Sequence, residues 1–461
     1  MARVYFKRLV AAATIGLGVA LAPALKADSL SDALASAYLE SNILDQNRAL
    51  LRAADEDVAQ AMAGLRPVIN FVSQSNFRFP ARVGGIKVNN WTSSIALNLR
   101  LVLFDGGVTR YATEAAKETV LGLRAALLDL EQQVLLNAVQ TYMEVIRASQ
   151  AVSLSQSNVR LITQELRAAR DRFEVGEVTR TDVSIAEARL AAARGNFAAS
   201  QGDLEVAREA YKAAIGRYPD QLRWPPAPPM TARNEAEAKA VAVRRHPSIS
   251  QAQRNVNAGE ANVARALAAI GPTISASAST SLDDQESYDK SASLTIDVPI
   301  YAGGTRRSLL RQAKARRDAA RVALLQSVVV VEQNVGIAWA NLSVAAATTE
   351  ASRRQVRAAQ VAYDGVREEA KLGARTTLDV LNAEQELLDA RSSLISAETQ
   401  QYVQVYALLA SMGLLTVEHL KLGIVTYDPA DYYNAATANP LRKISPQGAK
   451  LDKLLKSLGK N

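Results

Sequence analysis

The chain has 461 residues, of which 5% are aromatic and 22% charged, and its formal net charge is +8. It contains no cysteine, which excludes disulfides, thiol nucleophiles, zinc ribbons and a lipid-modified N-terminal cysteine. Four of the positive residues fall within the first 26 positions, and a net five lie beyond position 440. The body of the chain is therefore close to neutral and lacks the excess of basic residues that is typical of nucleic-acid-binding proteins.

The N-terminus predicts a cleavable export signal. Three positive residues, Arg3, Lys7 and Arg8, precede an apolar run over residues 9–25 that ends among small residues. This run is shorter than the roughly 20 apolar residues of a spanning helix, so we expect residues 1–27 to be a signal that is removed on export. No comparable apolar stretch follows, and a body that enters a membrane is expected to do so as β-strands.

The rest of the chain is an internal duplication. The sequence LFDGGVTR at 103–110 returns as IYAGGTRR at 300–307, and FEVGEVTRTDV at 173–183 returns as AKLGARTTLDV at 370–380, both with an offset of 197. Two matches in one register indicate two copies of one structural unit. The expected parts are a first repeat at 28–218, a Pro-rich linker at 219–232, a second repeat at 233–420 and a basic, partly disordered tail at 421–461.

Each repeat predicts a helix, two strands, a very long helix, a glycine turn and a returning helix. The first repeat has these elements at 29–66, 68–83, 91–104, 106–172, Gly176 and onward to Gly216. The second has them at 234–270, 273–282, 288–300, 303–371, Gly373 and onward to Gly413. Extra residues at 83–90 predict a longer hairpin loop in the first repeat. The glycine pairs predict strand-to-helix turns at Gly106, Gly107, Gly303 and Gly304.

Helix lengths and strand faces constrain the assembly. A long helix spans on the order of 100 Å and a short one roughly 57 Å, so two short helices stacked end to end match one long helix. The strands have one apolar and one polar face and about the length of outer-membrane strands. Four strands cannot keep open edges in lipid, so at least two chains must share a barrel. The predicted fold class is mainly α with a membrane β-barrel part, built from duplicated helix-strand-strand-helix halves.

The signal, the duplicated halves, the Gly-Gly pairs after the strands and the tip sequence VGEVTRTDV resemble the TolC family of outer-membrane factors. The resemblance covers about residues 29–420. It implies a homotrimer with a twelve-stranded barrel in outer-membrane lipid and a long α-helical coiled-coil tunnel in the periplasm. It also implies partners: a periplasmic adaptor (membrane fusion) protein and an inner-membrane pump of the ABC (type I secretion) or RND (drug export) type.

The resemblance also assigns roles near the turns at Gly176 and Gly373. Asp379 would form an acidic ring at the periplasmic gate, and Asn382 stands where relatives often have a second aspartate. Links that close the tips would run from Arg375 to Thr181 and Asp182, with Arg180 as a substitute because Ala370 replaces a family tyrosine. The adaptor-docking tip turns would be Val175, Gly176, Leu372 and Gly373.

Alternatives remain at this stage. Thr181, Asp182 and Thr377 lie where ordinary helix caps would lie, so capping alone would explain them. A soluble periplasmic coiled-coil scaffold or adaptor shares the long helices and the export signal. His246 and His419 lack acidic or thiol partners at catalytic or metal-binding spacing, and neither glycine pair is followed by Lys-Ser/Thr. We therefore expect no enzyme activity, no cofactor and no metal site.

Overall fold

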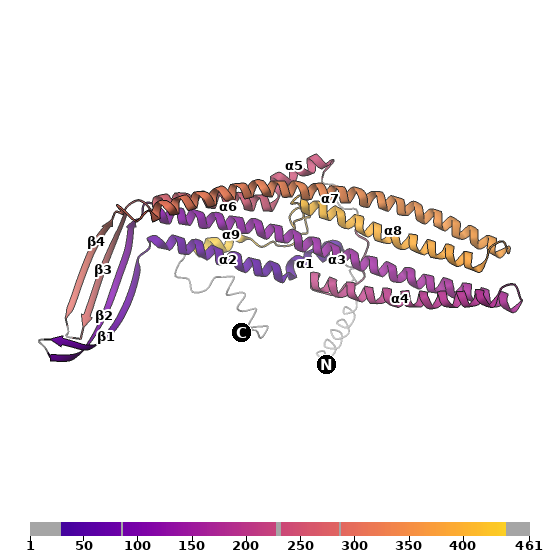
Figure 1. The fold of residues 1–461 in the computed structure, drawn as a ribbon, viewed down its shortest axis with the longest axis horizontal. Helices are drawn as coiled ribbons and strands as arrows, with labels where there is room; N and C mark the ends of the chain where they lie inside the picture. Colours follow the sequence, from indigo (N-terminus) through magenta and orange to yellow (C-terminus); the bar gives the residue numbers. More distant parts are fainter. Residues whose placement is uncertain (1–28, 84–85, 227–231, 285–286, 439–461) are drawn as a thin grey trace, which may run out of the picture.

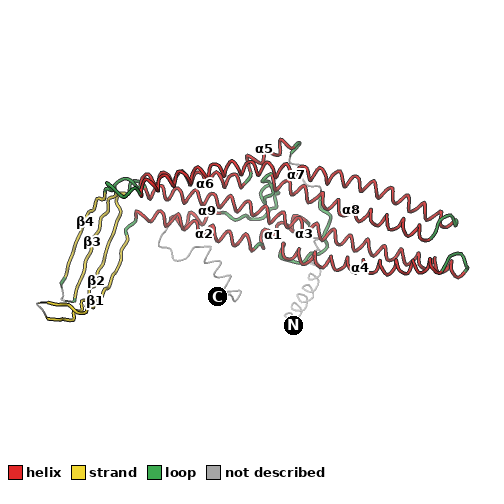
Figure 2. Tube along the Cα trace, viewed as in Figure 1, coloured by secondary structure: helices red, strands yellow, loops and turns green. Residues whose placement is uncertain are grey.

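A computed structural model of the protein describes residues 29–83, 86–226, 232–284 and 287–438. The molecule is strongly elongated, with the strands at one end and long helices that run to the other end, where two turns each connect a pair of helices (Figure 1). The predicted signal, part of the Pro-rich linker and the lysine-rich end of the tail lie outside the described residues. The view coloured by secondary structure shows that loops occur mainly at the two ends and near the middle of the helical part (Figure 2).

The two longest helices form the axis of the molecule. Helix α3 (Val108–Glu174) and helix α7 (Thr305–Lys371) have 67 residues each, as the duplication predicts. Each folds back at its tip into a shorter helix, α4 (Arg180–Ile215) or α8 (Thr377–Ser411). We call α3–α4 the first hairpin and α7–α8 the second hairpin. Contacts of α3 and α4 with α8 join the two hairpins.

The helix before each strand pair is broken in two, whereas the sequence predicted one continuous helix. The first consists of α1 (Leu30–Glu40) and α2 (Asn42–Met62), followed by the short 3-10 helix η1 (Ala63–Leu65). Ser41 breaks it because its extended backbone and side chain cap the start of α2. The second consists of α5 (Glu235–Arg245) and α6 (Pro247–Ala268), which are separated because proline cannot continue a helix.

The described residues include four strands in one antiparallel sheet of order β1-β2-β3-β4. They are β1 (Val68–Val83), β2 (Ile86–Phe104), β3 (Thr273–Asp283) and β4 (Tyr288–Asp297). Two boundaries differ from the expectation. The hairpin loop predicted at 83–90 is much shorter, because residues 86–90 continue β2 and pair with β1. Strand β4 ends before the predicted position 300, close to Pro299, which has no N–H for the ladder.

The register gives the sheet one polar and one apolar face. Asn70 pairs with Asn98, and Ser279 pairs with Ser291 through a hydroxyl contact of 2.7 Å. On the opposite face Phe71 pairs with Leu97. The apolar side chains are largely exposed in the single chain, including Phe71, Trp91, Leu97, Leu294 and Ile296. A sheet with an exposed apolar face requires an apolar environment outside the chain.

Each strand-to-helix turn contains a glycine pair with left-handed backbone, as expected. Gly106 and Gly107 have φ values of 67° and 94°, and Gly303 and Gly304 have 59° and 82°. In the first repeat Asp105 accepts hydrogen bonds from the backbone N–H of Gly107 (2.9 Å) and of Thr109 (2.7 Å). These bonds cap the free N–H groups at the start of α3.

The main hydrophobic core lies midway along the helices, where the stacked short helices meet. It contains fully buried Tyr142 of α3, Tyr211 of α4 and Leu409 of α8. The Tyr142 hydroxyl donates to the Arg223 carbonyl (2.7 Å), which anchors the linker between the repeats. Beyond α8, helix α9 (Pro429–Ala438) contacts α2, so residues 421–438 of the expected tail are packed on the body.

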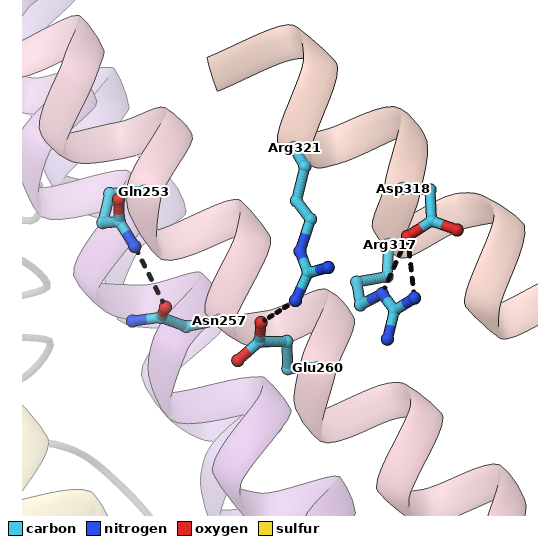
Figure 3. Close-up of polar contacts among 6 residues, drawn as sticks. All are labelled: Gln253, Asn257, Glu260, Arg317, Asp318 and Arg321. Carbon is cyan, nitrogen blue, oxygen red and sulfur yellow. Dashed lines mark hydrogen bonds and ion pairs between the residues drawn. The ribbon is translucent and has the colours of Figure 1, made fainter. Parts of the chain in front are cut away.

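Between this core and the sheet, polar pairs hold α6 against α7 and α3. Arg321 of α7 donates to Glu260 of α6 (2.8 Å), as Figure 3 shows. On the other side, Glu118 of α3 accepts from Arg254 (3.3 Å) and Asn257 (3.1 Å) of α6. Because exposed ion pairs contribute only about 0–1 kcal/mol each, these contacts fix alignment more than stability.

Helix α7 contains a longer apolar stretch than the locally hydrophobic passage at 327–331 that the sequence indicates. Within the described residues it is the one helix long and apolar enough to cross a membrane, and most of that stretch is exposed. Val322, Leu325 and Val329 are 64%, 67% and 56% exposed. The stretch lies within a helix on the order of 100 Å long that packs along α6 and α8, so it is part of the helical wall. Such a stripe is typical of a surface that further helices cover.

Candidate functional site

The two hairpin tips share one backbone construction. At each tip a glycine has left-handed backbone, with φ of 83° at Gly176 and 78° at Gly373. The next N–H reaches back to the preceding helix, from Glu177 to the Arg172 carbonyl and from Ala374 to the Glu369 carbonyl (both 2.9 Å). This pattern closes the end of a helix and reverses the chain within a few residues.

Each returning helix begins with a reciprocal capping box. The Asp182 carboxylate accepts from the Thr179 N–H (2.9 Å) and hydroxyl (2.7 Å), and Asp379 accepts from the Thr376 N–H (3.0 Å) and hydroxyl (2.9 Å). Thr179 and Thr376 are therefore the caps, whereas Thr181 lies inside the first turn of its helix. Capping accounts for both aspartates structurally.

The capping bonds also fix the charge of Asp379. Hydrogen bonds from the Thr376 backbone and side chain lower the pKa of the Asp379 carboxyl below its usual value, and its carboxylate is open to solvent. It is therefore a permanent negative charge at the tip of the second hairpin, which is the chemistry that an acidic ring needs. Asp182 has the same bonds and a lowered pKa at the first tip.

The expected link between Arg375 and the first tip is not formed within the chain. The Arg375 Nε donates to Glu369 of the same hairpin (2.8 Å). The Asp182 carboxylate accepts a hydrogen bond from the Thr179 hydroxyl instead. Glu369 raises the pKa of Arg375 above its usual value, so this cation is permanent. Arg180 is exposed at the start of α4, and its described contacts include no hydrogen bond to the second tip.

A different arginine joins the hairpins. Arg189 of α4 donates to the Asn382 side-chain oxygen of α8 (3.1 Å). Beside this bond the hairpins exchange apolar side chains. Leu381 of α8 belongs to the core of the first hairpin, and Leu161 of α3 packs against the core of the second. Arg189 could not be predicted from the sequence, because no local pattern indicates that it contacts position 382, which is 193 residues away.

A buried carboxyl group lies at this contact between the two hairpins, which we call the joint. Glu384 of α8 is 4% exposed, and neither of its oxygens has a hydrogen-bond partner. Burial raises the pKa of Glu384 to about 8, with a further contribution from Glu165 of α3, while Arg189 opposes the shift. The Tyr363 hydroxyl of α7 is also buried without a partner. The pattern of the sequence could not distinguish Glu384 from an exposed helix glutamate.

The described residues offer no group of three or more His, Cys, Asp or Glu side chains that could hold a metal ion. His246 has a structural role, because its Nδ1 accepts from the Ser248 N–H (3.2 Å) at the start of α6. Burial lowers the pKa of His246, which keeps the ring neutral as an acceptor. His419 lies in the segment after α8.

Comparison with known proteins decides the family. The model of the outer membrane efflux protein family matches residues 33–217 and 240–414, which correspond to the two repeats. The chain belongs to this family. The match confirms the resemblance drawn from the tip and turn sequences, and the proteins it groups are efflux channels rather than enzymes.

Individual relatives agree with the assignment. The outer membrane efflux protein BepC of Brucella suis biovar 1 (strain 1330) is 35% identical over 438 residues, covering 93% of this chain and 95% of BepC. Outer membrane protein TolC of Escherichia coli (strain K12) is 25% identical and covers 86% of this chain and 84% of TolC. A solved structure of CusC, described in terms of transmembrane channel formation, has a TM-score of 0.74 at 19% identity, covering 84% of this chain and 92% of CusC. The protein is thus an outer-membrane channel component with its helical part in the periplasm.

Proposed function

We propose that three copies of the chain assemble into one channel-tunnel that exports small toxic compounds or proteins across the outer membrane. One observation carries this proposal: the sheet has an apolar face, a polar face and two unpaired edges, β1 and β4. Because consecutive strands alternate in direction, β4 runs antiparallel to β1, so the β4 edge of one copy can pair with the β1 edge of the next. Closure removes every edge, which lipid requires.

The helical part supports the same assembly. The apolar stripe of α7, with Val322, Leu325 and Val329 exposed, would be covered by helices of a neighbouring copy. The strand–helix turns lie at one end and the hairpin tips at the other (Figure 1). With the strands in the outer membrane, the tips would face the periplasm and form the gate, where three copies of Asp379 would line an opening selective for cations.

The tips are also the proposed contact with a periplasmic adaptor protein and, through it, an inner-membrane pump of the ABC or RND class. Val175 and Leu372, the residues before the tip glycines, are apolar and 71% and 86% exposed. Exposed apolar side chains on equivalent turns are a matched pair of contact points, because exposed apolar surface often marks a site of protein–protein interaction.

Complementation tests the proposed function. In cells that lack their own export channel, the chain should restore drug resistance or protein secretion, and a Val175→Asp/Leu372→Asp double variant should not, although its assembly stays intact. A Glu177→Asp variant at the same turn is the control and should behave as the parent. If the chain washes from membranes with carbonate and restores neither activity, it is a soluble periplasmic scaffold instead.

A further inference from the structure

The joint between the two hairpins contains a charged and polar cluster that neither capping nor gating explains. Helix α8 lies between α7 and α3 (Figure 1), and contacts to both are extensive. Glu384 of α8 interacts electrostatically with Glu165 of α3, Arg189 of α4 and Tyr363 of α7. Tyr363 in turn interacts with Arg367 and Asp364 on its own helix. All four helices that form the tips therefore contribute to this cluster.

The cluster favours a neutral Glu384. A buried carboxylate is strongly unfavourable unless it is paired and hydrogen-bonded. Neither oxygen of Glu384 has such a partner, and the side-chain contact of Arg189 is with Asn382. Glu165 adds a like charge nearby. The packing of α8 against α3 therefore requires a proton on Glu384.

Apolar side chains also pack between the two hairpins at the joint. Leu381 is buried in the core of the first hairpin, and Leu161 packs against the core of the second. Glu384 is 4% exposed in the joined arrangement, and separation of the hairpins would expose it to water. An ionised Glu384 would gain hydration in the separated arrangement and would lose it in the joined one.

We propose that protonated Glu384 is a latch that holds the two hairpins together, and that its ionisation releases the α7–α8 hairpin from α3 and α4. In this account the periplasmic end is held most tightly in acid and loosens as the pH rises towards 8, or when a partner stabilises the ionised carboxylate. The pH-dependent separation of the hairpins does not depend on the proposed function. Only the link between this separation and opening of the channel rests on the proposed function.

The expected pH response has a defined direction. Once separated, Glu384 would return to the usual pKa of a glutamate, about 4.3, so separation releases a proton. The ratio of separated to joined hairpins should then rise up to roughly tenfold per pH unit until the pKa of the joined state, about 8, is passed, and level off above it.

The absence of cysteine allows a direct distance measurement. Nitroxide labels on Glu177→Cys and Ala374→Cys would report the separation of the tips, in assemblies that mix one labelled chain with unlabelled chains. The latch predicts a longer-distance population that grows from pH 6 to about pH 8 and then levels off. Glu384→Gln should abolish this growth and keep the short distance, whereas Glu386→Gln, which removes an exposed carboxylate two residues away, should leave it unchanged.

A second variant distinguishes the latch from simple destabilisation. Glu165→Gln removes the like charge and lowers the pKa of Glu384 in the joined state, so the ratio of separated to joined hairpins should level off at a lower pH and rise less, while still depending on pH. A pH response that persists in Glu384→Gln, or distances that do not change with pH in the parent, would overturn the latch. Conductance recorded on the same samples separates the two claims: a pH-dependent distance with constant conductance supports the latch and refutes only the gate at the tips.

Discussion

At the scale of single residues, the two tips use the same side chains in the same cap, yet they differ in what surrounds them. Asp182 and Asp379 have matching bonds to Thr179 and Thr376. The second tip adds Arg375 and Glu369, which pair with each other across an exposed surface. The bond that joins the hairpins involves Arg189 and lies within the helices beyond the tips.

The matched caps allow a clean test of the acidic ring. Asp379→Asn and Asp182→Asn should each weaken one helix start by about 1 kcal/mol, because both lose a capping carboxylate. Only Asp379→Asn should move the reversal potential of the channel in a salt gradient towards zero, which planar-bilayer recording measures. Equal reversal potentials in the two variants would reduce Asp379 to a helix cap.

Removal of the Arg189 side chain should affect opening more than removal of Arg375. Arg189→Ser breaks the bond to Asn382 and should increase the open fraction about five-fold, which corresponds to ~1 kcal/mol for an exposed hydrogen bond. Arg375→Ser loses only its pair with Glu369 inside one hairpin and should change the open fraction little. Single-channel recording compares the two, and a larger effect of Arg375→Ser would restore the link expected from the family.

At the scale of elements, glycines with the same left-handed backbone differ in what surrounds them. Gly373 has open space where a Cβ would lie, whereas a Cβ on Gly413 would approach the His246 Cα to 2.8 Å. Gly413 closes α8 where α5 gives way to α6, so the second repeat depends on close backbone packing there. This contact ties the end of the long hairpin to the break between the two short helices.

The glycine pair gives a prediction about stability. Gly373→Ala should cost about 1–2 kcal/mol, the usual cost of left-handed backbone for a residue with a Cβ. Gly413→Ala should cost clearly more, because the clash with the backbone of His246 adds to the same strain. Chemical unfolding followed by circular dichroism measures both, and equal losses would mean that the close approach at Gly413 relaxes without cost.

The elements also show what the sequence could predict. Glycine pairs, strand alternation and the 197-residue repeat located β1, β3, α3 and α7 to within a few residues. The break at Ser41 was missed because a serine inside a helical pattern looks like any exposed residue until its side chain is seen to cap α2. The tip residues were found as a group, but their partners depend on packing between hairpins, which local patterns do not encode.

At the scale of the whole molecule, buried carboxyl groups with raised pKa values couple the fold to pH, and they include Asp55, Glu131 and Glu384. Asp55 of α2 is fully buried without a hydrogen-bond partner, and burial raises its pKa to about 6, against the opposing effect of Arg124. Glu384 has a pKa of about 8. Both groups hold a proton in the folded chain at pH values where the unfolded chain has released it.

Stability should therefore fall as the pH rises. The folded state binds more protons than the unfolded state between about pH 4 and pH 8, so the favourable contribution present in acid is lost across that window. The melting temperature should be higher at pH 5.5 than at pH 8.5. An Asp55→Asn/Glu384→Gln double variant should flatten this dependence, and an undiminished slope in that variant would assign it to other groups.

The assembly is the central claim, because one chain leaves β1 and β4 unpaired at the edges of the sheet. The most direct test is the protein mass of the species extracted from outer membranes in mild detergent, measured by light scattering with the detergent contribution subtracted. The account predicts a stable species of three chains. A species of one chain, or one that carbonate releases from the membrane, would contradict the shared barrel and the channel built on it.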